Sequence, residues 1–265
     1  MPWAHVEDFR LYYQASGSGP ALIFAHGAGG NHLSWWQQVP HFAANYRCVT
    51  FDHRAFGRSH DATGGQGRRA FADDLRSLLD QLGIETVAVI AQSMGGRTAV
   101  GFALRNPGRV RALVLAGTTG GAVNDEVRDR QEAHRQTPLG RTSLARRAIA
   151  PRLRRERPEL AYLYGLIGRL NPPRPADFLA PIPGYRGSSA ERLAALNIPI
   201  LFLVGAEDAI TPPEIVRLAH EQVPGSQFDV IEEAGHSAYF ERAGAFNERV
   251  SRFLRDAGWE AGRAD

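Results

Sequence analysis

A serine at position 93 has the neighbours that a reactive nucleophile requires. It follows an apolar, β-branched run that begins at Thr86 and precedes a helix-compatible stretch that begins at Gly95. A buried strand that turns directly into a helix at a serine is the turn called a nucleophile elbow. Because the turn is tight, the residues two positions before and after must be small, and here they are Ala91 and Gly95. The alternative is an ordinary strand–helix junction with an incidental serine.

Two further residues, Asp208 and His236, could complete the machinery for acyl transfer. That reaction needs a nucleophile, a base that takes its proton and a carboxylate that orients the base. Asp208 follows an apolar run at 199–204, and His236 follows another at 227–231. The order serine, aspartate, histidine is the one expected when the serine lies on an elbow. Glu207 competes with Asp208 for the carboxylate role, and motif position favours Asp208.

A glycine-rich loop, 26–30, follows the apolar run at 21–25. Glycines let such a loop turn tightly and expose backbone N–H groups. A phosphate site is the alternative, but the spacing matches neither a dinucleotide fingerprint nor a P-loop with its lysine. We therefore expect the loop to donate to an oxyanion, and His26 to hold the loop. Trp35, a few residues further on, is either a core residue or part of the pocket entrance.

The elements that would position these residues alternate between strand and helix. Strands are expected at 21–25, 48–51, 86–91, 110–116, 199–204 and 227–231, and helices at 34–44 (with Ser34 as its cap), 68–82, 95–106, 212–222 and 243–254. The stretch 6–14 alternates loosely and predicts one or two antiparallel strands. This order predicts a mostly parallel, doubly wound α/β sheet with helices on both faces. Ligands bind beyond the carboxyl ends of such strands, where Gly27, Ser93 and Gly117 lie.

The alternation stops after about residue 118 and resumes near 193. Short helices are expected in between, at 125–135, 143–150 and 158–170. The chain is thus expected to comprise a core, 1–118 with 193–265, and a helical cap, 119–192. Residues 120–192 hold 14 arginines and 8 acidic residues. These arginines either steer an anionic substrate or partner or, as we favour here, form solvated helix faces. The apolar side chains expected to form a pocket roof are Leu153, Leu160, Tyr162, Leu163, Leu166, Ile167 and Phe178.

Composition excludes several classes of protein. Hydrophobic residues make up 43% of the 265 positions, and the single cysteine, Cys48, allows no disulfide framework and no cysteine metal site. All 31 basic residues are arginine, so there is no catalytic lysine, and a net charge of +3 does not favour nucleic acid as a partner. Asp52, His53 and His60 fit no metal-ligand spacing. Without an apolar secretion segment near the start or a run long enough to cross a membrane, we expect a soluble, cytoplasmic protein with a small-molecule substrate and no cofactor.

Taken together, the motifs resemble the α/β-hydrolase superfamily over almost the whole chain. The matching segments are 26–30, 52–59, 91–96, 205–208 with Pro212, and 235–236. The resemblance implies the α/β-hydrolase fold, with an eight-stranded sheet and a helical cap insertion. The roles that it implies are nucleophile for Ser93, general base and acid for His236, orienting carboxylate for Asp208, and oxyanion-hole N–H donors for Ala28 and Met94. Two departures, Ala91 and Ala55 where glycine is usual, remove no reacting group.

The resemblance also narrows the expected activity. Serine at position 93 argues against the haloalkane dehalogenases and epoxide hydrolases of the superfamily, which have aspartate there. The chain is most similar to capped esterases and enol-lactone hydrolases, which implies a serine hydrolase of small carboxylic esters or lactones, with Gly27, Gln92 and Trp35 at the substrate. C–C bond hydrolases of ring-cleavage pathways share the Ser-Met-Gly-Gly run, so a C–C hydrolase or lyase is a second interpretation. A third is a slow-turnover ligand receptor on the same fold.

Overall fold

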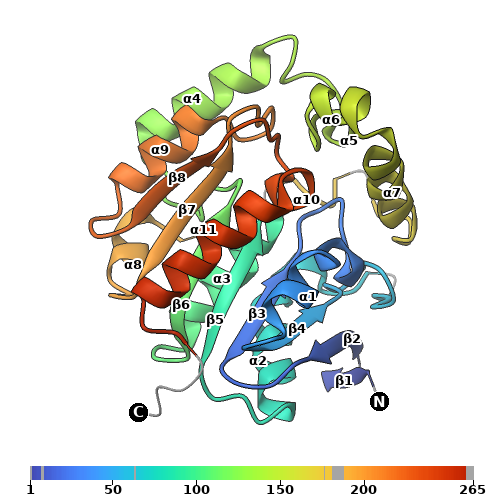
Figure 1. Cartoon of the computed structure of the whole chain (residues 1–265), viewed down its shortest axis with the longest axis vertical. Coiled ribbons are helices and arrows are strands. Elements are labelled where there is room, and N and C mark those ends of the chain that lie inside the picture. The colour runs from blue at the N-terminus through green and yellow to red at the C-terminus, as the bar shows by residue number, and fades with distance from the viewer. Residues whose placement is uncertain (1, 7–8, 63, 176, 181–187, 261–265) are drawn as a thin grey trace.

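The computed structural model describes residues 2–6, 9–62, 64–175, 177–180 and 188–260. In them eight strands form one sheet in the order β1-β2-β4-β3-β5-β6-β7-β8 (Figure 1). The strands are β1 (Trp3–Val6), β2 (Phe9–Ser16), β3 (Ala21–Ala25), β4 (Arg47–Phe51), β5 (Val87–Gln92), β6 (Val110–Ala116), β7 (Ile200–Gly205) and β8 (Gln227–Ile231). β2 pairs antiparallel with β1 and β4, and every other pair is parallel. The mostly parallel α/β sheet predicted from the sequence is confirmed, and the N-terminal stretch forms two strands.

The helices connect the strands and cover both faces of the sheet (Figure 1). They are the 3-10 helices η1 (His32–Trp35) and η2 (Gly67–Arg69) and the α-helices α1 (Gln38–Phe42), α2 (Phe71–Gln81), α3 (Met94–Arg105), α4 (Asp125–Gln136), α5 (Leu144–Arg147), α6 (Pro151–Glu156), α7 (Pro158–Arg169), α8 (Ala190–Ala194), α9 (Pro213–Glu221), α10 (Ala238–Glu241) and α11 (Ala243–Asp256). None of the helices in the described part of the chain is long and apolar enough to cross a lipid bilayer.

The central strands are buried on both faces, because successive side chains point into two separate apolar layers. On β5, for example, Val89 faces α2 and α3, whereas Ile90 faces the layer that contains α1 and α11. A strand covered on both sides consists mostly of apolar residues, and β3, β5 and β7 are buried throughout. This two-sided cover holds the carboxyl ends of the strands at one rigid edge.

The helix expected at 34–44 is two shorter elements, η1 and α1. The cap is Asn31 and not Ser34, because the Asn31 side chain accepts from the N–H of Leu33 at 3.0 Å. The Ser34 hydroxyl in turn accepts from the N–H of Asn31 at 3.1 Å. This reciprocal capping box begins a helix three residues earlier than the sequence pattern suggested. The start of the helix expected at 68–82 is likewise a separate turn, η2.

The segment between β6 and β7 is helical, with α4 to α8 in chain order. The helices expected at 125–135 and 158–170 are α4 and α7; α5 covers part of 143–150, and α6, which begins at Pro151, was not expected. α4 lies along α9 at the flank of the sheet, and α7 lies against η1 (Figure 1). α8 returns to the core, where Leu193 is fully buried. The segment therefore leaves the core at one strand end and re-enters it beside α3.

Candidate active site

Ser93 lies at the turn between β5 and α3 in a backbone conformation that few non-glycine residues adopt. Its φ is 51° and its ψ is −115°. Its N–H donates to the carbonyl of Ala116 on β6 at 2.8 Å, which fixes the turn at the sheet edge. A Cβ on Gly95 would lie 2.2 Å from the carbonyl oxygen of Ala25, and Ala91 is fully buried. The small neighbours of Ser93 therefore follow from the close approach of α3 to β3.

His236 and Asp208 lie side by side beyond the ends of β8 and β7. Nδ1 of His236 is 2.8 Å from Oδ2 and 3.0 Å from Oδ1 of Asp208. Oδ1 also accepts from the N–H groups of Ile210 and Thr211, each at 2.8 Å, so four contacts fix the carboxylate. An ionised carboxylate can only accept, so Nδ1 carries the proton and Nε2 is left with its lone pair. The arrangement can therefore present Nε2 as a base.

The geometry distinguishes the two acidic candidates. Glu207, the alternative to Asp208, accepts from Nε of Arg152 at 3.1 Å and is partly exposed. In the described residues it makes no hydrogen bond to His236. Gly117, by contrast, lies directly against the pair, since a Cβ there would be 3.1 Å from Nδ1 of His236 and 3.2 Å from Oδ2 of Asp208. The glycine at the end of β6 leaves room for the imidazole.

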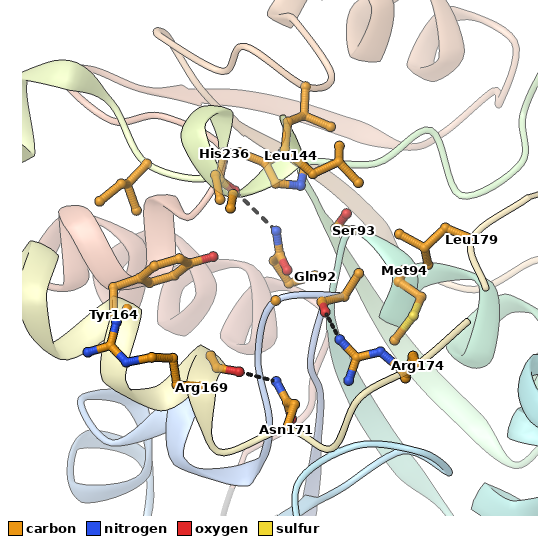
Figure 2. Close-up of a pocket in the computed structure, with 18 of the residues that line it drawn as sticks. Gln92, Ser93, Met94, Leu144, Tyr164, Arg169, Asn171, Arg174, Leu179 and His236 are labelled. Atoms are coloured by element: carbon orange, nitrogen blue, oxygen red, sulfur yellow. Dashed lines mark hydrogen bonds between the residues drawn. The ribbon is translucent and has the colours of Figure 1, made fainter. Parts of the chain in front are cut away.

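Ser93 and His236 both line a cavity of about 750 Å³ beyond the strand ends (Figure 2). Gln92 and Met94, on either side of the serine, are also in its wall, as is Ala28 of the glycine-rich loop. The side-chain amide of Gln92 donates to the backbone carbonyl of His236 at 3.2 Å and so connects the loop after β8 to β5. Ser93 and His236, far apart in the sequence, thus face the same cavity.

Of the three residues expected at the substrate, Gln92 lines the cavity and the other two do not. Trp35 is fully buried, with its ring 5.3 Å from that of Phe24 and 4.5 Å from that of Tyr239. The expectation that Trp35 lines the pocket is wrong, because η1 turns the indole under the loop and into the core. Gly27 lies behind the wall: a Cβ there would be 1.9 Å from Oε1 of Gln92. Its role is to let β3 and β5 approach.

The roof of the cavity comes from other residues than the apolar ones expected. None of the seven side chains expected there lines the cavity among the described residues: Leu153, Leu160, Tyr162, Leu163, Leu166, Ile167 and Phe178. Ile167 is buried against the core, and Tyr162 is 66% exposed. The roof positions of α7 follow one helical face at spacings of three and four, and they are Ala161, Tyr164, Gly165, Gly168 and Arg169. Because large apolar side chains fill the core instead, small residues at helical spacing were the signal that could have located this face.

Two backbone N–H groups beside Ser93, those of Ala28 and Met94, have no hydrogen-bond partner among the described residues. Met94 is the first residue of α3, so its N–H is one of the donors that a helix leaves unpaired at its N-terminus. Ala28 lies in a tight turn that the N–H of Gly30 closes by donating to the carbonyl of Gly27 at 3.1 Å. Both residues line the cavity. Donors placed in this way can bind a negatively charged oxygen.

His26 holds the glycine-rich loop against the neighbouring turn. Its Nδ1–H donates to the carbonyl of Gly27 at 2.8 Å, and its Nε2 accepts from the N–H of His53 at 3.0 Å. The second bond requires a lone pair on Nε2, so the ring must be neutral. Complete burial lowers the pKa of His26 from 6.5 to about 4. The structural role expected for His26 is consistent with these contacts.

Acid is expected to destabilise the fold through His26. The unfolded chain takes up this proton near pH 6.5, whereas the folded protein takes it up only near pH 4. Between these values the unfolded state binds more protons, so stability falls as the pH falls, by up to about 3 kcal/mol from this group. Urea unfolding measured from pH 7.5 to pH 4.5 should be less steep with pH in His26→Gln. The matched variant His41→Gln, at an exposed histidine, should keep the wild-type slope, and equal slopes in all three proteins would contradict the assignment.

Glu241 is a buried carboxylate that joins the loop carrying His236 to the segment between β6 and β7, called the inserted segment below. Its Oε2 accepts from the N–H of Ala150 at 2.9 Å, and its Oε1 accepts from the N–H of Ser237 at 3.3 Å. The N–H of Gly235 also donates to it, and burial nevertheless raises the pKa of the Glu241 carboxyl. A Cβ on Gly235 would lie 2.6 Å from the nitrogen of Ala150, so the two segments touch here. The sequence analysis missed this residue, because no local spacing of the kind seen in a capping box marks it: Glu241 lies four residues after Ser237, and the box requires three.

Removing the Glu241 carboxylate should loosen the loop that holds His236. Glu241→Ala leaves several buried N–H groups unpaired, so the free energy of unfolding should fall by about 2–4 kcal/mol, with a loss of kcat of roughly tenfold. Glu241→Gln keeps one good acceptor and should lose less. Thermal unfolding and ester hydrolysis measure the two effects. Glu248→Ala, at an exposed carboxylate on the next helix, is the control; a similar small effect of all three substitutions would refute the role.

Nothing in the described part of the chain is arranged as a metal centre: no three or more His, Cys, Asp or Glu residues are grouped to hold an ion. Asp52 and His53, two of the three residues whose spacing was tested for a metal site, contact other groups. Asp52 Oδ1 accepts from the N–H of His32 at 2.7 Å and contacts its Nδ1 at 2.8 Å. Nε2 of His53 is 2.9 Å from the hydroxyl of Thr98. These contacts fix the turn after β4.

Comparison with known proteins shows the family of the chain. The chain matches the family model described as alpha/beta hydrolase fold over residues 20–243. It is 30% identical to a putative carbamate hydrolase, RutD, of Azorhizobium caulinodans, over 96% of this chain and 98% of that protein. It is 28% identical to a 2-hydroxy-6-oxononadienedioate/2-hydroxy-6-oxononatrienedioate hydrolase of Cupriavidus pinatubonensis, over 93% of this chain and 91% of that one. Among solved structures, a thermophilic esterase of Thermogutta terrifontis superposes with a TM-score of 0.78 at 26% identity, over 96% of this chain and 97% of the esterase.

Proposed function

The chain belongs to the alpha/beta hydrolase family, and from this premise we propose that it is a serine hydrolase that cleaves a small carboxylic ester or lactone. The observation that carries the proposal is the hydrogen-bonded pair of His236 and Asp208 at the wall of the cavity that Ser93 also lines. A serine, a base and an orienting carboxylate are the groups that acyl transfer requires.

In the proposed mechanism, Oγ of Ser93 attacks the carbonyl carbon of the substrate while Nε2 of His236 takes the hydroxyl proton. Asp208 stabilises the imidazolium that forms and keeps the proton of Nδ1 in place. The carbonyl oxygen becomes an oxyanion, which the N–H groups of Ala28 and Met94 stabilise; one such donor is typically worth a hundredfold or more in rate. The proton on Nε2 then passes to the leaving oxygen. Water, activated by the same nitrogen, releases the acid and restores Ser93.

The inserted segment is proposed to act as a cap, as its expected boundaries 119–192 suggest. α5 and α7 supply Leu144, Ala161 and Tyr164 to the cavity wall. A cavity of about 750 Å³ is in the range of small-molecule sites, which supports a small substrate. Because the cap lines most of the cavity away from the serine, it is the part that would select among substrates.

A second candidate is the hydrolysis of a C–C bond with the same three residues. It is favoured by the similarity to the dioate hydrolase of Cupriavidus pinatubonensis, which covers nearly all of both chains. A panel of a carboxylic ester, a lactone, a carbamate and a vinylogous diketone separates the candidates by their kcat/KM. The highest value for the diketone would replace the ester proposal with the C–C one. A receptor with slow turnover would bind members of the panel, but its kcat would be very low for all of them.

The direct test is covalent labelling of Ser93 by an organophosphonate, followed by intact-mass analysis. One adduct per chain is expected, located on the peptide that contains Ser93. Ser93→Ala should take up none, and His236→Ala should react far more slowly, because the hydroxyl then lacks its base. A folded wild-type protein that takes up no label, or a Ser93→Ala variant that is labelled like the wild type, would overturn the proposal.

A further inference from the structure

The cavity is lined by cations and by no anion. Five arginines contribute to its wall, and no aspartate or glutamate does among the described residues. The arginines are Arg68, Arg97, Arg154, Arg169 and Arg174. Several other arginines of the inserted segment face outward and pair with acids there, as Arg135 does with Glu132. Arg154, Arg169 and Arg174, the arginines of the segment that line the cavity, form no ion pair with a carboxylate of the described residues.

Arg174 is among the more enclosed of these cations. Its side chain is half-buried, with the guanidinium 4.0 Å from the ring of Phe56 and 5.8 Å from that of Phe178. Its Nη1 donates to the carbonyls of Ala55 at 3.2 Å and Pro172 at 3.4 Å. No carboxylate pairs with it in the described part of the chain. Burial lowers the pKa of the Arg174 guanidinium, as expected for a cation that lacks a counter-ion.

Arg174 is also tied to the loop next to Ser93. Its Nη2 lies 3.4 Å from the carbonyl oxygen of Ala28, and Figure 2 shows this contact as a dashed line on the side of the cavity away from His236. Neutral carbonyls satisfy some of its donors but none of its charge. The other candidates are more exposed: Arg97, Arg154 and Arg169 lie at the rim. The guanidinium of Arg174 is therefore the group best placed to meet a charge on a molecule bound at Ser93.

We propose that the substrate carries a carboxylate and that Arg174 binds it, so that the enzyme prefers acidic esters or lactones over neutral ones of the same size. The proposal rests on the proposed serine hydrolase activity and adds the charge of the substrate. A guanidinium can hold a carboxylate by two parallel N–H donors, and its stacking on Phe56 fixes its plane. The bound anion would supply the counter-ion that the folded protein lacks at this position.

The test compares two p-nitrophenyl esters with the same leaving group: mono-p-nitrophenyl glutarate and its methyl ester. The wild type should favour the acid in kcat/KM. In Arg174→Gln, KM for the acid should rise roughly 10- to 100-fold, whereas kcat/KM for the methyl ester should stay within about threefold. Arg174→Lys should recover part of the loss, since an ammonium keeps the charge but not the planar fork. Arg130→Gln, an exposed arginine of α4 outside the cavity lining, controls for net charge.

The outcomes separate this proposal from the one on which it rests. Equal losses for both esters in Arg174→Gln would mean that the guanidinium only supports the Ala28 loop, and the carboxylate proposal would be abandoned. Hydrolysis of the methyl ester and labelling of Ser93 test the serine hydrolase independently. If Arg174→Gln does not fold, inhibition of the wild type decides: glutarate should inhibit at least tenfold more strongly than dimethyl glutarate, and equal inhibition would refute the proposal.

Discussion

Replacing Ser93 with alanine is expected to lower kcat for an activated ester by about 10⁵- to 10⁶-fold, because among the described residues of the cavity wall Ser93 is the only serine, threonine or cysteine. The change removes one oxygen and keeps the Cβ, so the strained turn at φ 51° is retained. The free energy of unfolding should therefore change by no more than about 0.5 kcal/mol. Initial rates of p-nitrophenyl acetate hydrolysis and urea unfolding measure the two quantities in the same preparation.

A matched control removes the same oxygen elsewhere. Ser226 lies in the turn before β8, where its hydroxyl contacts Nδ1 of His220 at 2.7 Å, and it does not line the cavity. Ser226→Ala should hydrolyse the ester at the wild-type rate. More than about 1% of the wild-type activity in Ser93→Ala would mean that water attacks the substrate directly, and Ser93 would then lose the role of nucleophile.

The sheet and the relative order of the reacting residues could be predicted because both depend on local patterns. Buried parallel strands consist of nearly continuous apolar residues, which makes runs such as 87–91 recognisable in the sequence. Parallel strands joined by helices place all their carboxyl ends at one edge, so polar residues after β7 and β8 had to lie near Ser93. The structure brings Asp208 and His236 within 2.8 Å of each other at that edge.

The cavity could not be predicted in the same way, because its walls depend on how helices are rotated and on where they pack. In the sequence, apolar residues of the core and of a pocket look alike. Trp35 and Ile167 belong to the core, and Leu160 and Leu163 pack against it. The number of charges in the sequence cannot distinguish Arg152, which pairs with Glu207, from Arg174, which lines the cavity and pairs with no carboxylate of the described residues. The small residues at 161, 165 and 168 were informative only once the direction of α7 was known.

Asp208→Asn is expected to lower kcat by about 10³- to 10⁴-fold with little change in KM. The amide can still accept from the N–H groups of Ile210 and Thr211, which bond the present carboxylate at 2.8 Å, so the turn should be kept. Its NH₂ would then face Nδ1 of His236, which favours the tautomer with the proton on Nε2. That nitrogen could no longer take the proton of Ser93, and the imidazolium would lose its counter-ion. Steady-state kinetics at pH 8 measure the loss.

Glu207→Gln gives the matched comparison, because it makes the same chemical change at the neighbouring acid. The carboxylate of Glu207 contacts Arg152 at 3.1 Å on the partly exposed side of the loop, so its loss should cost at most a few-fold in kcat. The two substitutions therefore differ by about a thousandfold if the base is oriented from position 208. The reverse ranking would require the loop after β7 to turn by one residue in the working enzyme and bring Glu207 to the imidazole. Equal, small losses would mean that His236 keeps its tautomer without either acid.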